Sequence, residues 1–305
     1  MLSSPLSKAG FSRAEFINFM KRKLIIVLLS FVILFCVAMW VLAGSLIAPQ
    51  NVSVGEPPLD LNAVKVEFPS KSGATIHGWF IVGEKGKGAV ALMHGIRGSR
   101  LDLIERARFL SREGYTVLLF DFQAHGESKG DNITVGYLES LDAQAAISFL
   151  REESPNEKIG VIGISMGGAA VLLAQPALNV DVLVLEEVYP TIEQAVSNRM
   201  AERLGSWARI LTPLLTIQIR LRLGFSANEL RPIEKVVQNS SPKLFIVGAE
   251  DKYTTLDESK SLFDKANGTK EFWSVSGAGH QDIHSFAKQE YEQKVLSFLE
   301  KHLRN

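Results

Sequence analysis

The sequence predicts an α/β protein built around a mostly parallel, doubly wound β-sheet. From Asn62 onward, short apolar runs alternate with longer segments of helical periodicity, and this repeated order of strand and helix is typical of that architecture. The short runs are apolar throughout, which suits strands covered by helices on both faces. A chain of 305 residues allows one large domain of about 250 residues and an appendage.

Composition narrows the class of protein. Hydrophobic residues make up 46% of the chain and charged residues 22%, with 33 basic against 33 acidic side chains, so neither disorder nor a nucleic-acid-binding surface is indicated. The one cysteine, Cys36, lies in the most apolar stretch, which excludes a disulfide scaffold and a cysteine-ligated zinc site. The sequence has no glycine-rich nucleotide motif and no His-Glu-x-x-His pattern, so we expect neither a cofactor nor a metal.

The N-terminal region predicts a membrane anchor. Residues 24–48 form an uncharged apolar run of 25 positions, and about 20 suffice for a helix to cross a bilayer. Residues 1–23 carry five basic side chains and one acidic one, so we expect this leader to be cytoplasmic and the rest of the chain to lie on the non-cytoplasmic side. The alternative is a cleaved signal peptide, because Ala43, Gly44 and Ser45 are small enough for a cleavage site.

Residues 49–61 predict a linker, because they include the pair Pro57-Pro58 and have no apolar period. The globular domain is then expected at 62–305. Its strands are expected at residues 75–82, 89–93, 115–120, 158–164, 181–185, 243–247 and 271–275. Its helices are expected at residues 100–113, 136–150, 166–175, 256–265 and 286–303.

Residues 191–232 interrupt the alternation of strand and helix. They have no strand pattern and are strongly apolar around Trp207, with Arg209, Arg220 and Arg222 interspersed. We interpret them as a helical insertion. Three roles stay open: ordinary core of a small lid, a pocket for an apolar group, or a surface resting on a bilayer next to anionic lipid.

The segment from Gly163 to Gly167 fits the pattern G-x-S-x-G, with Ser165 at its centre. It follows a predicted strand directly and precedes a predicted helix, which is the context of a nucleophilic serine in a tight, strained turn. A serine hydroxyl is a poor nucleophile until a base accepts its proton. A histidine oriented by a carboxylate is therefore expected elsewhere in the chain.

Asp251 and His280 are the candidates for that acid and base. Asp251 lies just after the strand predicted at 243–247, and His280 lies in a glycine-rich loop after the strand predicted at 271–275. Serine, acid and histidine then follow one another in the chain order of a known group of hydrolases. Glu250 is the alternative acid, but its place in the turn favours it less than Asp251.

These three segments together resemble the α/β-hydrolase superfamily over about residues 63–303. The resemblance implies an α/β-hydrolase fold: a mostly parallel sheet of the eight-stranded type, helices on both faces and a small helical lid at 191–232. It also implies that the backbone N–H groups of Ile96 and Met166 form the oxyanion hole. A membrane anchor followed by such a domain is similar to the Bem46-like hydrolases, close to the prolyl-oligopeptidase-like domains.

Several other polar residues need an interpretation. The resemblance makes His94 and His125 structural, holding early turns by hydrogen bonds, and Gln123 stands where many members of the superfamily have an arginine. Glu186 and Glu187 end the strand predicted at 181–185. They either contact substrate or are solvated strand ends.

The sequence therefore predicts a serine hydrolase that cleaves carboxylic esters of acyl or lipid-like substrates through a Ser165–His280–Asp251 triad and an acyl-enzyme. A peptidase or amidase with the same triad is the first alternative, because acyl transfer does not depend on one leaving group. A binding protein that uses the fold without catalysis is the second. The expected partners are a small-molecule ester and the bilayer, with no nucleic acid.

Overall fold

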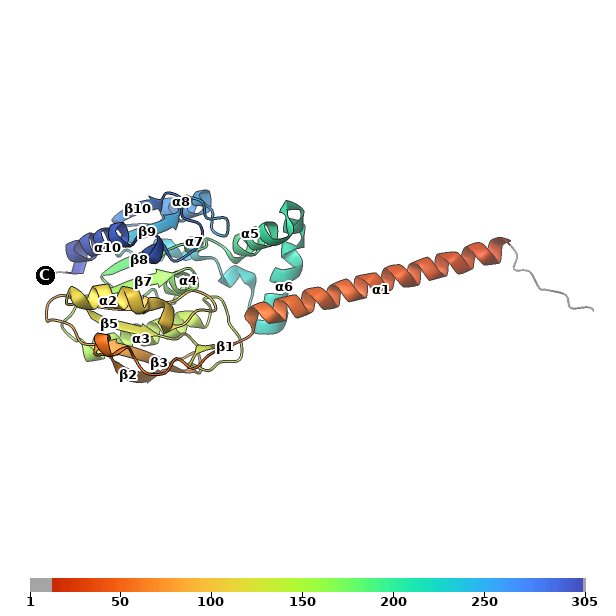
Figure 1. The fold of residues 1–305 in the computed structure, drawn as a ribbon. Helices are drawn as coiled ribbons and strands as arrows, with labels where there is room; N and C mark the ends of the chain where they lie inside the picture. Colours follow the sequence, from red (N-terminus) through yellow and green to blue (C-terminus); the bar gives the residue numbers. More distant parts are fainter. Residues whose placement is uncertain (1–12, 304–305) are drawn as a thin grey trace, which may run out of the picture. The chain divides into compact units, whose positions relative to one another are not determined.

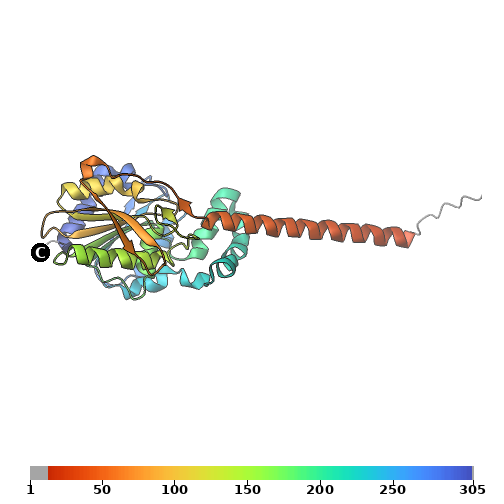
Figure 2. The same ribbon diagram turned by 90° about the horizontal axis from the view of Figure 1, so that it is seen from below.

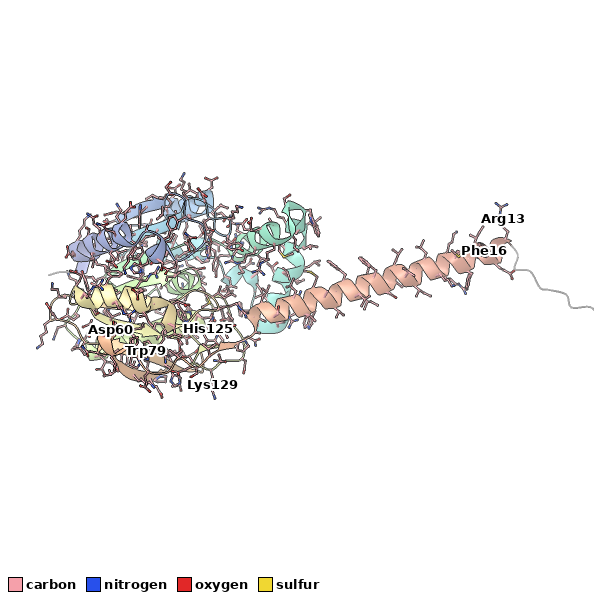
Figure 3. All side chains as sticks on the ribbon, in the orientation of Figure 1. Arg13, Phe16, Asp60, Trp79, His125 and Lys129 are labelled. Carbon is pink, nitrogen blue, oxygen red and sulfur yellow. The ribbon has the colours of Figure 1, made fainter. Side chains whose placement is uncertain are left out.

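The computed structural model describes residues 13–303, so part of the predicted leader, residues 1–12, lies outside the described residues. The chain divides into an N-terminal unit that ends at Ser45 and a globular unit that begins at Leu46. Helix α1 (Arg13–Ile47) has 35 residues and carries apolar side chains on all sides; Arg13 and Phe16 lie near its start in Figure 3. By length and composition α1 is able to cross a membrane.

The globular unit is built on one eight-stranded sheet with the order β10-β9-β8-β7-β4-β5-β3-β2. The strands from β10 to β5 are parallel, and β3 runs antiparallel to both β5 and β2. The strands are β2 (Val64–Pro69), β3 (Thr75–Ile81), β4 (Ala89–Met93), β5 (Thr116–Phe120), β7 (Ile159–Ile164), β8 (Val182–Glu186), β9 (Lys243–Gly248) and β10 (Lys270–Val275). The predicted fold class is confirmed.

Helices cover both faces of this sheet (Figures 1 and 2). The helices are α2 (Ile104–Arg112), α3 (Glu139–Glu153), α4 (Met166–Leu173), α8 (Leu256–Lys265), α9 (Ile283–Phe286) and α10 (Lys288–Leu303). Apolar side chains of α3, α4 and α8 share one buried cluster, and those of α2 and α10 share another. The two clusters receive alternate residues of the same strands, as period-two side-chain alternation requires.

Some predicted elements differ from the structure in number or extent. Strand β2 was not predicted, because Lys65 and Glu67 alternate with apolar residues and the strand is an edge strand with most of its residues exposed. The helix predicted at 136–150 begins only at Glu139, since Gly136 has φ 111° and belongs to the preceding turn. The helix predicted at 286–303 corresponds to α10, which begins two residues later, at Lys288, and a separate short helix, α9, ends at Phe286.

The segment predicted to be a linker, residues 49–61, is largely ordered on the globular unit. Gln50 and Asn51 form a short strand, β1, that pairs in parallel with β6 (His125–Gly126). The N–H of Gln50 donates to the carbonyl of Ala124 at 2.7 Å. Satisfied backbone groups, which the proline content did not reveal, fix this segment.

Residues 191–232 are helical between β8 and β9. The segment contains α5 (Ile192–Leu204), a 3₁₀ stretch (Ser206–Leu211), α6 (Thr212–Leu223), a 3₁₀ turn (Ala227–Glu229) and the start of α7 (Pro232–Lys235). The Thr191 side chain caps α5 by accepting the N–H of Gln194, and Gly224 ends α6 in the left-handed conformation. Helices α5 and α6 pack side by side (Figure 1).

Candidate active site

Ser165 is the one residue between the end of β7 and the start of α4. Its φ of 48° is in the left-handed region, which is strained for a residue with a side chain. The flanking glycines make the turn possible: a Cβ at Gly163 would lie 2.7 Å from the Cα of Gly168, and one at Gly167 would lie 2.4 Å from the carbonyl oxygen of Met93. The sequence pattern thus corresponds to a turn that only glycine neighbours permit.

Asp251 and His280 form a hydrogen bond. Asp251 Oδ2 is 2.7 Å from His280 Nδ1, while Oδ1 accepts the backbone N–H groups of Tyr253 at 2.7 Å and Thr254 at 2.9 Å. These contacts hold the Asp251 carboxylate in one orientation, with Oδ2 facing the imidazole ring. Because Asp251 engages Nδ1, the other ring nitrogen of His280, Nε2, is left for proton transfer.

Strand pairing places the three predicted residues at one edge of the sheet. Ser165 follows β7, Asp251 follows β9 and His280 follows β10, and β7, β8, β9 and β10 are consecutive parallel neighbours. The connecting turns are hydrogen-bonded to one another, from Ser165 N to Glu186 O at 2.7 Å and from Glu250 N to Ala278 O at 2.8 Å. Ligands of open α/β sheets bind at this carboxyl edge.

The segment after β4 lies against the turn that holds Ser165. A Cβ at Gly95 would lie 3.7 Å from the Cβ of Ser165, so the backbone beside Ile96 approaches the serine closely. Within residues 13–303, the N–H groups of Ile96 and Met166 donate no hydrogen bond. Met166 is the first residue of α4, where a helix leaves its N–H groups without intrahelical partners. Two free donors near Ser165 are what an oxyanion hole requires.

His94 and His125 hold the backbone, as predicted. His94 Nε2 accepts the N–H of Phe122 at 3.1 Å, and His125 Nε2 accepts the N–H of Arg97 at 3.1 Å. Burial, and then the neighbouring His125, lower the pKa of His94 to about 3, and burial also lowers the pKa of His125. Neutral, fully engaged imidazoles at these positions have no free nitrogen for catalysis.

Gln123, the departure from the superfamily pattern, is an internal structural residue. Its Nε2 donates to Glu139 Oε1 and to the carbonyl of Asn132, both at 2.8 Å. The side chain is 3% exposed. It therefore binds the loop after β5 to the start of α3 and does not reach the serine turn.

Glu187 lies beside the Asp251–His280 pair, a position that the sequence did not indicate. The prediction of a solvated strand end is wrong, because its side chain is 2% exposed, whereas substrate contact stays a prediction. Glu187 Oε2 lies 3.7 Å from His280 Nδ1, and Oε1 accepts the N–H of Gln281 at 3.4 Å. Burial, then Asp251 and Glu186, raise the pKa of Glu187 to about 9. At neutral pH it is an uncharged acid beside the Asp251–His280 pair.

Glu186 is not solvated either. Its carboxylate accepts from Arg106 Nη2 at 2.8 Å and from the hydroxyl of Tyr291, and all three side chains are buried. Arg106 also contacts Asp282 Oδ1 at 2.8 Å. This buried ion pair joins α2 to the end of β8, directly before Glu187. The partner, Arg106, is 80 residues away in the chain, so sequence spacing gave no signal.

Glu187, Asp251 and His280 also have the ligand types of a divalent-cation site, since one ligand atom of each lies within 4.8 Å of the others. Binding a cation there requires an ionised Glu187 and a deprotonated His280 Nδ1. The hydrogen bond between Nδ1 and Asp251 and the raised pKa of Glu187 both oppose those states. The arrangement is better suited to proton transfer through His280.

Comparison with known proteins places the chain among hydrolases. Residues 84–221 match the family described as "Serine aminopeptidase, S33"; the match includes Ser165 and ends before Asp251. The uncharacterized protein YqkD of Bacillus subtilis (strain 168) is 26% identical over 239 residues, which cover 76% of this chain and 78% of YqkD. The alpha/beta hydrolase domain-containing protein WAV2 of Arabidopsis thaliana is 25% identical over 265 residues, which cover 80% of this chain and 82% of WAV2.

Solved structures give the same result. An esterase of Pyrococcus furiosus superposes with a TM-score of 0.70 at 24% identity and covers 85% of this chain and 98% of its own. The Bem46-like group within the superfamily stays a prediction. The order of the eight strands, the glycine-flanked turn at Ser165 and these similarities together show that the chain has the α/β-hydrolase fold.

Proposed function

We propose that this chain is a membrane-anchored serine hydrolase that cleaves carboxylic esters. The observation that carries the proposal is the 2.7 Å hydrogen bond between Asp251 and His280 at the sheet edge that also presents Ser165 in its strained turn. A histidine oriented by a carboxylate at that edge is the arrangement that activates a serine hydroxyl. The esterase among the solved structures supports the ester as substrate class.

The proposed reaction has two steps, acylation of Ser165 and hydrolysis of the acyl-enzyme, and His280 transfers a proton in both. His280 Nε2 accepts the proton of Ser165 as Oγ attacks the ester carbonyl, and Asp251 stabilises the imidazolium. The N–H groups of Ile96 and Met166 donate to the oxyanion of the tetrahedral intermediate. His280 then protonates the leaving alcohol, which leaves an acyl-enzyme on Ser165. Water, activated by His280, releases the carboxylic acid and restores the serine.

A serine peptidase or amidase is the second candidate. It is favoured by the family description that matches residues 84–221, and the triad geometry does not distinguish an alcohol from an amine as leaving group. The two candidates differ in their demand on the site, since only amide cleavage requires strong protonation of the leaving nitrogen by His280.

The test is turnover of p-nitrophenyl esters of increasing acyl length and of aminoacyl p-nitroanilides by the full-length protein in detergent. We expect ester turnover with an optimum chain length, and its loss in Ser165→Ala but not in the matched variant Ser111→Ala on α2. Turnover of the anilides alone would replace the esterase with a peptidase. Turnover of neither class, with a fluorophosphonate probe also failing to react, would favour a binding role.

The membrane part of the proposal rests on α1. We propose that α1 is an uncleaved anchor, with the leader in the cytoplasm and the globular unit on the other side. The apolar length of α1 supports the anchor, and the five basic residues before residue 24 support the orientation. Protease protection in sealed membrane vesicles tests it: the globular unit is expected to be protected when the cytoplasmic face is outward, and its digestion there would reverse the orientation.

A further inference from the structure

An exposed row of apolar side chains runs along the helical insertion. The row begins in the 3₁₀ stretch and continues along α6 with spacings of three or four residues, so its members share one helical face. Its members and their exposed fractions are Trp207 66%, Ile210 78%, Leu214 45%, Ile217 61% and Leu221 67%. We call these five residues the α6 row. Large apolar side chains that lie together in solvent mark a surface that binds another apolar surface.

The fold itself does not use the α6 row. Helix α6 is held by its opposite side, where Leu215 is buried and Ile219 and Leu223 pack against the main apolar cluster. Gln218, also buried, donates to the carbonyl of Leu214 one turn earlier. Because α6 already has a packed face, the α6 row is available to a partner.

Charge around the α6 row indicates what that partner is. Residues 203–228 contain four arginines and no acidic residue, and they lie between Glu202 and Glu229. The chain as a whole carries 33 basic and 33 acidic side chains, so this local excess of positive charge is specific to the insertion. An apolar helical face flanked by arginines is the pattern of a helix that lies in the surface of an anionic bilayer.

The chain also limits how far the globular unit can lie from a membrane that α1 crosses. Only Ala48 and Pro49 separate the last residue of α1 from the first residue of β1, and three residue steps span at most about 10 Å. A bilayer surface is therefore always within reach of the globular unit, whatever its orientation.

We propose that the α6 row is seated in the surface of the anionic bilayer that α1 crosses. This deepens the proposed function and depends on it, since the substrates would be esters resident in that bilayer. A second copy of the chain fits less well: two α6 rows packed together would bring the arginines of both copies close to each other, and like charges at short range oppose association. The bilayer supplies the opposite charge.

The test places a fluorophore at one chosen position, which is possible because the chain has a single native cysteine, Cys36, that can be replaced. In a Cys36→Ser background, the full-length protein receives one new cysteine, from Ile210→Cys or Ile217→Cys, and an environment-sensitive fluorophore. Asn228→Cys, exposed in the same insertion but outside the α6 row, is the matched control. The proteins are reconstituted in vesicles of equimolar phosphatidylglycerol and phosphatidylcholine.

We expect a blue shift and strong quenching by nitroxide-labelled lipid at positions 210 and 217, with neither at 228. Pure phosphatidylcholine vesicles should weaken both effects, because the arginines then lose their counterions. Fluorophores at 210 and 217 that stay in water would overturn the proposal. So would fluorophores shielded from water but not quenched by lipid, with quenching between labelled copies, because that result indicates a protein partner.

A second readout separates this proposal from the esterase proposal. The double variant Ile210→Glu/Ile217→Glu should keep turnover of a soluble short ester and lose at least about tenfold on an ester held in the vesicles, because two apolar contacts with lipid are lost. If the double variant turned over both substrates as fast as the wild type does, a role for the α6 row would be overturned. Absence of ester turnover in the wild type, together with lipid quenching at 210 and 217, would overturn the esterase and leave the bilayer contact standing.

Discussion

The carboxyl edge of the sheet and the helical insertion are built in opposite ways. At the edge, Asp251, Glu186 and Glu187 are almost fully buried, and hydrogen bonds or ion pairs fix each of them. On the insertion, the α6 row leaves large apolar side chains in solvent. The difference fits the two proposals made above, in which fixed side chains at the sheet edge carry out the reaction and the α6 row contacts the bilayer.

The largest effect on ester turnover is expected from replacing Asp251, at the edge of the sheet. Asp251→Asn replaces the anion that orients His280 with a neutral amide and should lower ester kcat by about 10⁴-fold while KM changes little. Steady-state kinetics on a soluble p-nitrophenyl ester measures both. Glu250→Gln, next in the chain, is the control and should keep nearly full turnover. Loss of activity in Glu250→Gln instead of Asp251→Asn would make Glu250 the acid.

Next in size is the buried ion pair beneath the edge. Arg106→Leu leaves Glu186 buried without its cation and should lower the free energy of unfolding by about 3–5 kcal/mol. Urea denaturation followed by circular dichroism measures the loss. The double variant Arg106→Leu/Glu186→Gln should lose less than Arg106→Leu alone, because the uncompensated charge is gone. An equal loss in both would show that packing, not charge, accounts for the effect.

Replacing Glu187 should change the free energy of unfolding by a smaller amount and in the opposite direction. Its pKa is raised from 4.5 in the unfolded chain to about 9, so it costs stability as pH rises between these two values and costs nothing below the lower one. Glu187→Gln removes that cost and should raise the free energy of unfolding by about 1–3 kcal/mol near neutral pH, with almost no gain near the lower value. Denaturation series across this pH range measure it; a gain independent of pH would contradict the assigned titration.

The smallest effect on stability is expected on the insertion. Ile217→Ser removes an exposed apolar group that contributes nothing to the packed face of α6, so the free energy of unfolding in detergent should change by less than about 0.5 kcal/mol. Leu215→Ser, two residues earlier and buried, is the matched control and should cost about 2–4 kcal/mol. Similar losses in the two variants would mean that the α6 row is part of the core.

Much of the site was predictable because its signals are local. Strand β4 was predicted with both ends correct, since an unbroken apolar run of five residues has one interpretation in an alternating α/β chain. The turn around Ser165 was predictable for a similar reason, because its strain is relieved by glycines adjacent in the sequence. The chain order of Ser165, Asp251 and His280 added a constraint that single motifs lack.

The parts that were missed depend on contacts between distant residues. Nothing near Glu187 in the sequence indicates that it is buried beside His280, because the turn after β10 is what covers it. The pairing of Glu186 with Arg106 is equally remote. Strand β2 escaped prediction because an edge strand keeps charged side chains on its open face, and β1 because two residues give no periodic signal.

The role proposed for Ser165 can be tested by finding the residue that a covalent probe modifies. Full-length protein in native membranes is treated with a fluorophosphonate and digested, and the modified peptide is identified by mass spectrometry. We expect one phosphonylated residue, Ser165, with labelling lost in Ser165→Ala and strongly slowed in His280→Gln, since the serine then lacks its base. A phosphonylated residue other than Ser165, or labelling that persists unchanged in Ser165→Ala, would contradict the assignment of Ser165 as the nucleophile.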